Sequence, residues 1–144
     1  MKYALTILGG LALSGTAALA DGHASGDAAA GESIFRQCAS CHVIANGDEV
    51  LAGRGKTGPN LYGLFGRQAG TVEGFDYGDS IVAAGQAGLE WNEEDFLAYV
   101  EDPRSFLQTY LDDKGARSKM SFRLRKGGED VWAYIVSMGP EVTN

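Results

Sequence analysis

The sequence has 144 residues, of which 44% are hydrophobic and 22% are charged, a composition typical of one small globular domain rather than a disordered or fibrous chain. Its formal net charge is −7, with 19 acidic residues against 12 basic ones, which argues against general binding to nucleic acids. We therefore expect a single hydrophobic core and no nucleic-acid partner.

Residues 1–20, MKYALTILGGLALSGTAALA, have the features of a secretory signal peptide. Lys2 is followed by a short apolar run, and Ala18 and Ala20 form an Ala-x-Ala cleavage site. The run is too short to span a bilayer, and no second long apolar run follows it. An N-terminal core helix or an uncleaved membrane anchor is the alternative. We predict cleavage after Ala20, export to the periplasm, no membrane insertion, a flexible tail at residues 21–26 and one domain at 27–144.

Three helices are expected from their caps and apolar periodicity. The first, in "GDAAAGESIFRQC", has Asp27 as its N-cap and runs toward Cys38. The second, in "WNEEDFLAYVEDP", is capped by Asn92 and stops before Pro103. The third, in "GGEDVWAYIVSMGP", has apolar residues at three- and four-residue spacing and ends at Gly139.

Long loops are expected between these helices. Residues 46–88 are rich in glycine and show no clear helical or strand period, and the stretch "FLQTYLDDKGARSKMSF" is also predicted as a loop. Such a long irregular stretch inside a compact domain usually has a function. The predicted fold class is all-α with long loops.

Charge is distributed unevenly. Residues 73–102 contain nine acids and no base, which we interpret as solvated faces. Residues 104–126 contain two acids and seven bases, which form a possible docking surface. These bases are Arg104, Lys114, Arg117, Lys119, Arg123, Arg125 and Lys126.

The stretch "FRQCASCHVI" carries the strongest chemical signal, Cys38 and Cys41 followed directly by His42. A thioredoxin-like dithiol would need strands that the sequence does not suggest. Structural zinc needs four ligands, whereas the chain has two cysteines and two histidines. A disulfide across two residues is disfavoured. Cys-x-x-Cys-His is the signature of covalent haem attachment, in which two thioether bonds leave His42 to reach the iron.

The sixth iron ligand would separate an electron carrier from a haem catalyst or gas sensor. Met120 and Met138 remain after signal cleavage, and Met138 fits the apolar stripe of the last helix. Met120, in "RSKMSF", is expected on an irregular loop and is the preferred ligand. His23 is the competing candidate, disfavoured by its position in the tail.

Taken together, these residues resemble a class I c-type cytochrome, and the match is closest to the bacterial cytochrome c2 and cytochrome c-550 branch. The resemblance covers essentially the whole mature chain, through "GDAAAGESIFRQCASCH", "KTGPNLYGLFGRQAG", "GFDYGDS", "KMSF" and "DVWAYI". It implies the cytochrome c fold, with several helices and long Gly-rich loops around one covalently bound haem c. It also implies that the first and last helices cross near Gly31 and Tyr134.

The resemblance also implies roles for other residues around the haem. Pro59 would accept a hydrogen bond from the ring of His42 and orient it. Arg67, Tyr77 and Trp91 match residues that bind or neutralise the haem propionates, Tyr99 matches a tyrosine near the sixth ligand, and Phe122 matches an aromatic residue that covers the haem edge. Ordinary core packing is the alternative for the four aromatic residues.

Two positions depart from the family pattern. The segment between Pro103 and Met120 is longer than in mitochondrial relatives, so contacts of the shorter loop do not transfer to this chain. Many relatives carry an asparagine four residues after the tyrosine that matches Tyr77, whereas this chain has Ile81.

The expected function is that of a monomeric periplasmic electron carrier without substrate turnover. The resemblance implies reduction by a quinol:cytochrome c oxidoreductase and delivery of the electron to a photosynthetic reaction centre or a terminal oxidase. The alternatives are a haem enzyme or ligand sensor with a displaceable sixth ligand, and a thiol–disulfide oxidoreductase.

Overall fold

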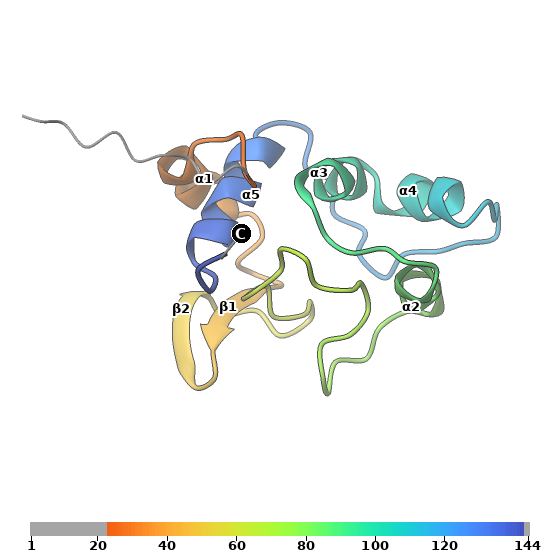
Figure 1. Ribbon diagram of the computed structural model, residues 1–144, viewed down its shortest axis with the longest axis horizontal. Coiled ribbons are helices and arrows are strands. Elements are labelled where there is room, and N and C mark those ends of the chain that lie inside the picture. Colours follow the sequence, from red (N-terminus) through yellow and green to blue (C-terminus); the bar gives the residue numbers. More distant parts are fainter. Residues whose placement is uncertain (1–22, 143–144) are drawn as a thin grey trace, which may run out of the picture.

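The computed structural model describes residues 23–142, so the predicted signal peptide and its cleavage site lie outside the described residues. Within this range the chain forms five helices and one two-stranded hairpin (Figure 1). In chain order these elements are α1 (Ala28–Phe35), β1 (Val43–Asn46), β2 (Glu49–Gly53), α2 (Asp79–Gln86), α3 (Glu93–Glu101), α4 (Pro103–Tyr110) and α5 (Gly128–Ser137). The all-α class is confirmed, since the hairpin is the only sheet among the described residues. None of the described helices is long and apolar enough to cross a bilayer.

Helices α1 and α5 pack against each other, and Figure 1 shows them side by side at one end of the molecule. Gly31 on α1 makes this close approach possible. A Cβ atom at this position would overlap the carbonyl oxygen of Asp130 and lie 2.8 Å from Cβ of Tyr134. The predicted crossing near Gly31 and Tyr134 is confirmed.

The predicted N-caps of two helices are confirmed. The carboxylate of Asp27 accepts hydrogen bonds from the backbone N–H groups of Ala29 and Ala30 at the start of α1. The side chain of Asn92 accepts from the N–H of Asp95 at 3.0 Å and starts α3. These side chains satisfy donors that the first turn of a helix leaves without a partner.

Helix α4 corrects the expectation that the chain forms a loop after Pro103. Asp102 ends α3 and also caps α4, because its carboxylate accepts from the N–H of Ser105 at 3.0 Å. Proline suits the first turn of a helix, where its missing N–H group costs no hydrogen bond. The apolar side of α4 buries Leu107. The irregular loop therefore begins only after Tyr110.

The glycine-rich region also contains structure that was not predicted. β1 and β2 pair antiparallel across a two-residue turn at Gly47 and Asp48, where Gly47 has a φ of +59°. A two-residue Gly-Asp connection is a recognised hairpin signal in a sequence. Helix α2 forms further along, and its Gly85 lies so close to the backbone of Ala69 that a side chain would not fit.

Residues 23–26, the described part of the predicted tail, lie against the domain. The carbonyl of His23 accepts a 2.7 Å hydrogen bond from the indole N–H of the fully buried Trp132. The His23 ring lies 4.4 Å from that of Phe65. The N–H and hydroxyl groups of Ser25 both donate to the carboxylate of Glu93. This segment is therefore held against α5 by His23 and against α3 by Ser25.

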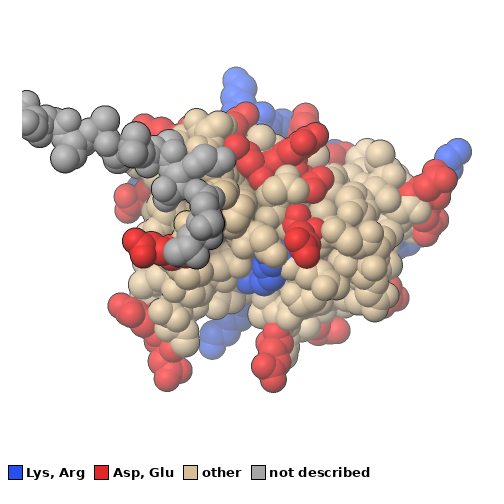
Figure 2. All heavy atoms as spheres, viewed as in Figure 1, with Lys and Arg blue, Asp and Glu red and all other residues tan. Residues whose placement is uncertain are grey.

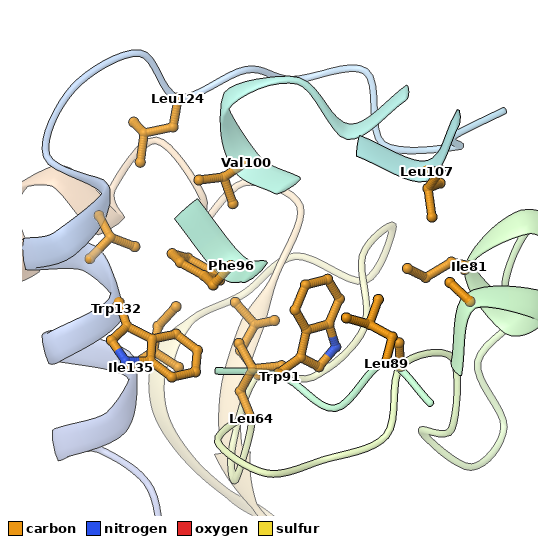
Figure 3. Close-up of a cluster of buried hydrophobic side chains, with 14 of the residues drawn as sticks. Leu64, Ile81, Leu89, Trp91, Phe96, Val100, Leu107, Leu124, Trp132 and Ile135 are labelled. Carbon is orange, nitrogen blue, oxygen red and sulfur yellow. The ribbon is translucent and has the colours of Figure 1, made fainter. Parts of the chain in front are cut away.

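Buried hydrophobic side chains form one continuous cluster in the core (Figure 3). At one end Trp132 and Ile135 of α5 lie beside Phe96 of α3, and the rings of Phe96 and Trp132 are 5.1 Å apart. Trp91 lies between this group and a second one formed by the side chains of Ile81, Leu89 and Leu107. Each of the five helices contributes at least one side chain to this cluster, and Trp91 lies near its centre.

Candidate functional site

Cys38, Cys41 and His42 lie on a tight turn that follows α1. The N–H of Cys38 donates to the carbonyl of Phe35 at 2.8 Å. The carbonyl of Cys38 accepts from the N–H groups of Cys41 and His42, at 3.0 and 2.9 Å. The two thiols and the imidazole are therefore held on one hydrogen-bonded unit whose geometry depends on α1.

The glycine-rich loop that follows β2 packs directly against this turn. Gly55 lies against the backbone of Cys41, where a Cβ atom would overlap main-chain atoms. The N–H of Gly58 donates to the carbonyl of Cys41 at 2.7 Å. A Cβ atom at Gly58 would lie 2.6 and 2.7 Å from the two ring nitrogens of His42. The glycines in this loop thus allow the backbone to support the imidazole from one side.

The ring of His42 has a defined tautomer. Its Nδ1 atom lies 2.8 Å from the carbonyl oxygen of Pro59, which can only accept, so Nδ1 carries the proton. Burial lowers the pKa of His42, although the hydrogen bond to Pro59 opposes this effect. A neutral ring protonated at Nδ1 leaves the lone pair of Nε2 free to bind a metal ion.

The two thiols have different environments. Burial, and to a lesser degree the nearby Cys41, raises the pKa of Cys38 to about 11. The Cys41 thiol is exposed, and hydrogen bonds from Thr57 and Ser40 lower its pKa. Thr57 was not singled out from the sequence, and its place directly before Gly58 and Pro59 was the available signal.

One cavity of about 340 Å³ brings all ten predicted cofactor-binding residues together. It is lined by residues from the turn after α1, from the loop after β2, from the core and from the loop before α5. The ten residues are Cys38, Cys41, His42, Pro59, Arg67, Tyr77, Trp91, Tyr99, Met120 and Phe122. Phe122 is 39% exposed, which places it at the mouth of the cavity.

Of the two methionines in the described chain, Met120 lines this cavity. Met138 is the C-cap of α5 and packs against the core cluster. His23 packs on Phe65 instead of lining the cavity. The structure therefore brings Met120, and neither alternative, into the same cavity as His42.

The backbone next to Met120 is held by a polar group that sequence reasoning missed. The hydroxyl of Ser118 accepts from the N–H of Met120 at 3.1 Å and lies 3.3 Å from the hydroxyl of Tyr99. Burial raises the pKa of Tyr99, while the Ser118 hydrogen bond lowers it. The position of Met120 is thus linked to α3 through two hydroxyl groups.

Arg67 supplies a cation inside the cavity. Its guanidinium donates to the carbonyls of Tyr62 and Asn60 at 3.1 and 3.0 Å, and burial lowers its pKa. It forms no ion pair with any residue of the described chain. Since partly buried charges are normally paired, this cavity favours a ligand that carries a negative group.

Ile81, one of the two expected departures from the family pattern, is buried on the cavity wall. The hydroxyl of nearby Tyr77 accepts a 3.4 Å hydrogen bond from the N–H of Val72. The wall at Ile81 is therefore apolar.

The residues present fit a haem with two thioether links. Two thiols and a neutral imidazole lie on one turn, and the sulfur of a methionine faces the same cavity. Imidazole and thioether sulfur are the axial ligands typical of electron-carrying cytochromes. The lining is mainly apolar, and Arg67 supplies a charge suited to a propionate group.

Comparisons with known proteins agree with this site, although no protein-family model matches the chain. Cytochrome c-551 of Roseobacter denitrificans is 56% identical over 117 residues, which are 80% of this chain and 83% of that protein. Cytochrome c-550 of Paracoccus denitrificans is 44% identical over 130 residues, covering 88% of this chain and 83% of that one. The solved structure of cytochrome c2 from Rhodobacter capsulatus matches with a TM-score of 0.75 at 54% identity, covering 78% of this chain and 97% of that one.

Proposed function

Because this chain belongs to the family of cytochromes c2 and c-550, an electron-transfer haem protein family, we propose that it carries single electrons between membrane redox complexes in the periplasm. Members of this family carry one covalently bound haem c. The observation that carries the proposal is the single cavity shared by Cys38, Cys41, His42 and Met120.

In this proposal Cys38 and Cys41 would form the two thioether links, and His42 and Met120 would bind the iron. The bound haem supplies the redox chemistry, since its iron gains and loses one electron. His42 offers Nε2 in a fixed orientation because Nδ1 is held by the carbonyl of Pro59. The hydrogen bond to Ser118 orients the backbone of Met120. The guanidinium of Arg67, which has no ion-pair partner among the described residues, would compensate the charge of a propionate.

The place of Met120 in the cavity lining supports electron transfer over substrate turnover, because its sulfur would close the second position on the iron. A carrier needs both axial positions filled, whereas an enzyme or a ligand sensor needs one position open. The proposed donor is a quinol:cytochrome c oxidoreductase, and the proposed acceptor is a reaction centre or a terminal oxidase. Export would use the predicted signal peptide at residues 1–20.

Docking to these complexes is proposed at the mouth of the cavity. Of the seven bases between residues 104 and 126, Arg117 and Lys119 line the cavity. Arg123 instead pairs with Asp102 at 2.9 Å and, with Arg125, lines a separate groove between α3 and α4. Figure 2 shows acidic side chains spread over the visible face and basic ones mainly at its edges. The positive charges of Arg117 and Lys119, which we call the basic rim of the cavity, would steer an acidic partner toward this site although the net charge of the chain is negative.

The mass and the visible spectrum of the purified protein test this function. We expect a mature mass equal to residues 21–144 plus one haem, haem that acidic acetone does not extract, a low-spin reduced spectrum and a weak methionine-to-iron band. Extractable haem would contradict covalent attachment. A high-spin resting form would instead favour the enzyme or sensor alternative.

A further inference from the structure

The loop that carries the proposed ligand is tied to the opposite side of the cavity mouth. We define the Met120 loop as residues 116–122 and the facing segment as residues 73–80. The ammonium group of Lys119 lies 2.8 Å from a carboxylate oxygen of Asp76 and donates to the carbonyl of the same residue at 3.1 Å. The N–H of Arg117 donates to the hydroxyl of Ser80 at 3.0 Å.

The stem of Lys119 also follows the facing segment closely. A Cβ atom at Gly78 would lie 3.3 Å from Cγ of Lys119, so the aliphatic chain of the lysine lies along the backbone of this glycine. Both Lys119 and Asp76 line the cavity. The side chain directly before Met120 therefore crosses the rim of the cavity to reach Asp76.

Other contacts of the Met120 loop lie further inside. Ser118 links the N–H of Met120 to the hydroxyl of Tyr99 on α3, and Ala116 is buried. Movement of Met120 out of the cavity by swinging this loop outward would separate Lys119 from Asp76. The ion pair therefore favours the closed position of the loop over an open one.

We propose that the Lys119–Asp76 pair is a latch that holds the Met120 loop closed, with both residues acting as positioning residues for the sixth ligand. This inference rests on the proposed function, because it takes Met120 as the ligand. The latch lowers the fraction of molecules in which the iron is open to small molecules.

The expected size of the effect follows from the exposure of the pair. The side chains of Lys119 and Asp76 are 59% and 96% exposed, so water and salt screen their attraction. Exposed ion pairs of this kind shift equilibria by about two- to five-fold. A ligand that binds only the open form gains apparent affinity in proportion to the open fraction.

Imidazole binding to the ferric holoprotein tests the latch, because imidazole must displace Met120 to reach the iron. The variants are Asp76→Ala, the matched control Glu73→Ala and the conservative replacement Asp76→Glu. Glu73 is an exposed acid in the same segment and makes no ion pair with the described residues. The readout is the imidazole concentration that removes half of the methionine-to-iron band.

We expect Asp76→Ala to lower the half-saturating imidazole concentration about two- to five-fold. Glu73→Ala should leave it unchanged, and Asp76→Glu should restore most of the wild-type value. Added salt should raise imidazole affinity in the wild type more than in Asp76→Ala.

Equal affinities for Asp76→Ala and Glu73→Ala would overturn the latch, as would failure of Asp76→Glu to restore closure. Failure of the proposed function is recognised separately in Met120→Ala. If that variant kept the methionine-to-iron band, Met120 would not be the ligand. If it lost the band while Asp76→Ala bound imidazole as the wild type does, only the latch would be wrong.

Discussion

Gly58 lies so close to His42 that a single added methyl group would collide with the imidazole. A Cβ atom there would be 2.6 Å from Nδ1 and 2.7 Å from Nε2. The hydrogen bond of the ring to Pro59, one residue further along, depends on the same stretch of backbone. Gly58 thus allows the backbone to lie against the ring, and the carbonyl of Pro59 determines the tautomer of the proposed ligand.

Gly58→Ala should displace the His42 ring or the loop that supports it. We expect a lower yield of holoprotein and, in what matures, a changed reduced spectrum and a shifted reduction potential, because ligand orientation and basicity change. Gly115→Ala is the control, since its nearest neighbour is the flexible side chain of Asp113 at 3.1 Å. Identical spectra and yields for both variants would show that the loop adapts freely.

Met120→Ala should lower the reduction potential and open the iron to small ligands. Thioether sulfur is a poor donor to ferric iron and favours the ferrous state, so its removal favours the oxidised form. Met138→Leu should leave the spectrum unchanged, because Met138 packs at the C-terminal end of α5. Redox titration and the methionine-to-iron band check both variants, and the reverse result would assign the ligand to Met138.

Arg117→Glu should slow electron transfer to an acidic partner. Arg117 is exposed and lines the cavity, so its charge acts where the partner approaches. We expect a decrease of about two- to ten-fold at low salt, with the wild-type rate also falling as ionic strength rises. Stopped-flow measurements provide these second-order rates.

Arg104→Glu is the matched control for this docking prediction. It makes the same change of charge on α4, at an exposed residue outside the cavity lining. Lys119→Glu is less suitable, because it would also break the pair with Asp76. Equal slowing by Arg117→Glu and Arg104→Glu would indicate that net charge, rather than a local rim, controls the encounter.

Gly31→Ala should destabilise the packing of α1 on α5. The added Cβ would overlap the Asp130 carbonyl, and backbone atoms cannot rotate away as side chains can. We expect a loss of about 1–3 kcal/mol in the free energy of unfolding, measured with urea. Ala30→Val, on the exposed side of the same helix, should cost less. If Gly31→Ala and Ala30→Val lowered the free energy of unfolding equally, the close approach of α1 and α5 at Gly31 would not contribute to stability.

Local features of the sequence were sufficient to predict the Cys-x-x-Cys-His turn and three of the helices. Cys38, Cys41 and His42 are almost contiguous, so their proximity needs no tertiary contact. The caps at Asp27 and Asn92 were predicted correctly because a capping side chain bonds to N–H groups only two or three residues away. Helix α4 and the hairpin were missed although Asp102-Pro103 and Gly47-Asp48 carry recognised signals.

The attachment motif and the loop position of Met120 selected four of the ten predicted residues, and the resemblance to a known family added the other six. The structure places all ten in the cavity lining. For the aromatic residues, the sequence alone left the role open. Trp91 and Tyr99, for example, have the pattern of ordinary core residues, and core packing was a sufficient explanation for each. The structure adds residues that no pattern marked, among them Thr57 and Ser118. Thr57 forms a hydrogen bond with the Cys41 thiol, and Ser118 bonds with both the N–H of Met120 and the hydroxyl of Tyr99.

The sequence by itself determined the attachment chemistry, because Cys-x-x-Cys-His places its reactive groups within one turn of chain. Only the tertiary structure decided that Met120 rather than Met138 or His23 lines the cavity with His42, that Lys119 reaches Asp76, and that residues 23–26 pack on α5. The physical reason is the range of the interactions. A turn or a cap is made by neighbours along the chain, whereas a cavity and the ties across its mouth are made by segments that meet only when the core forms.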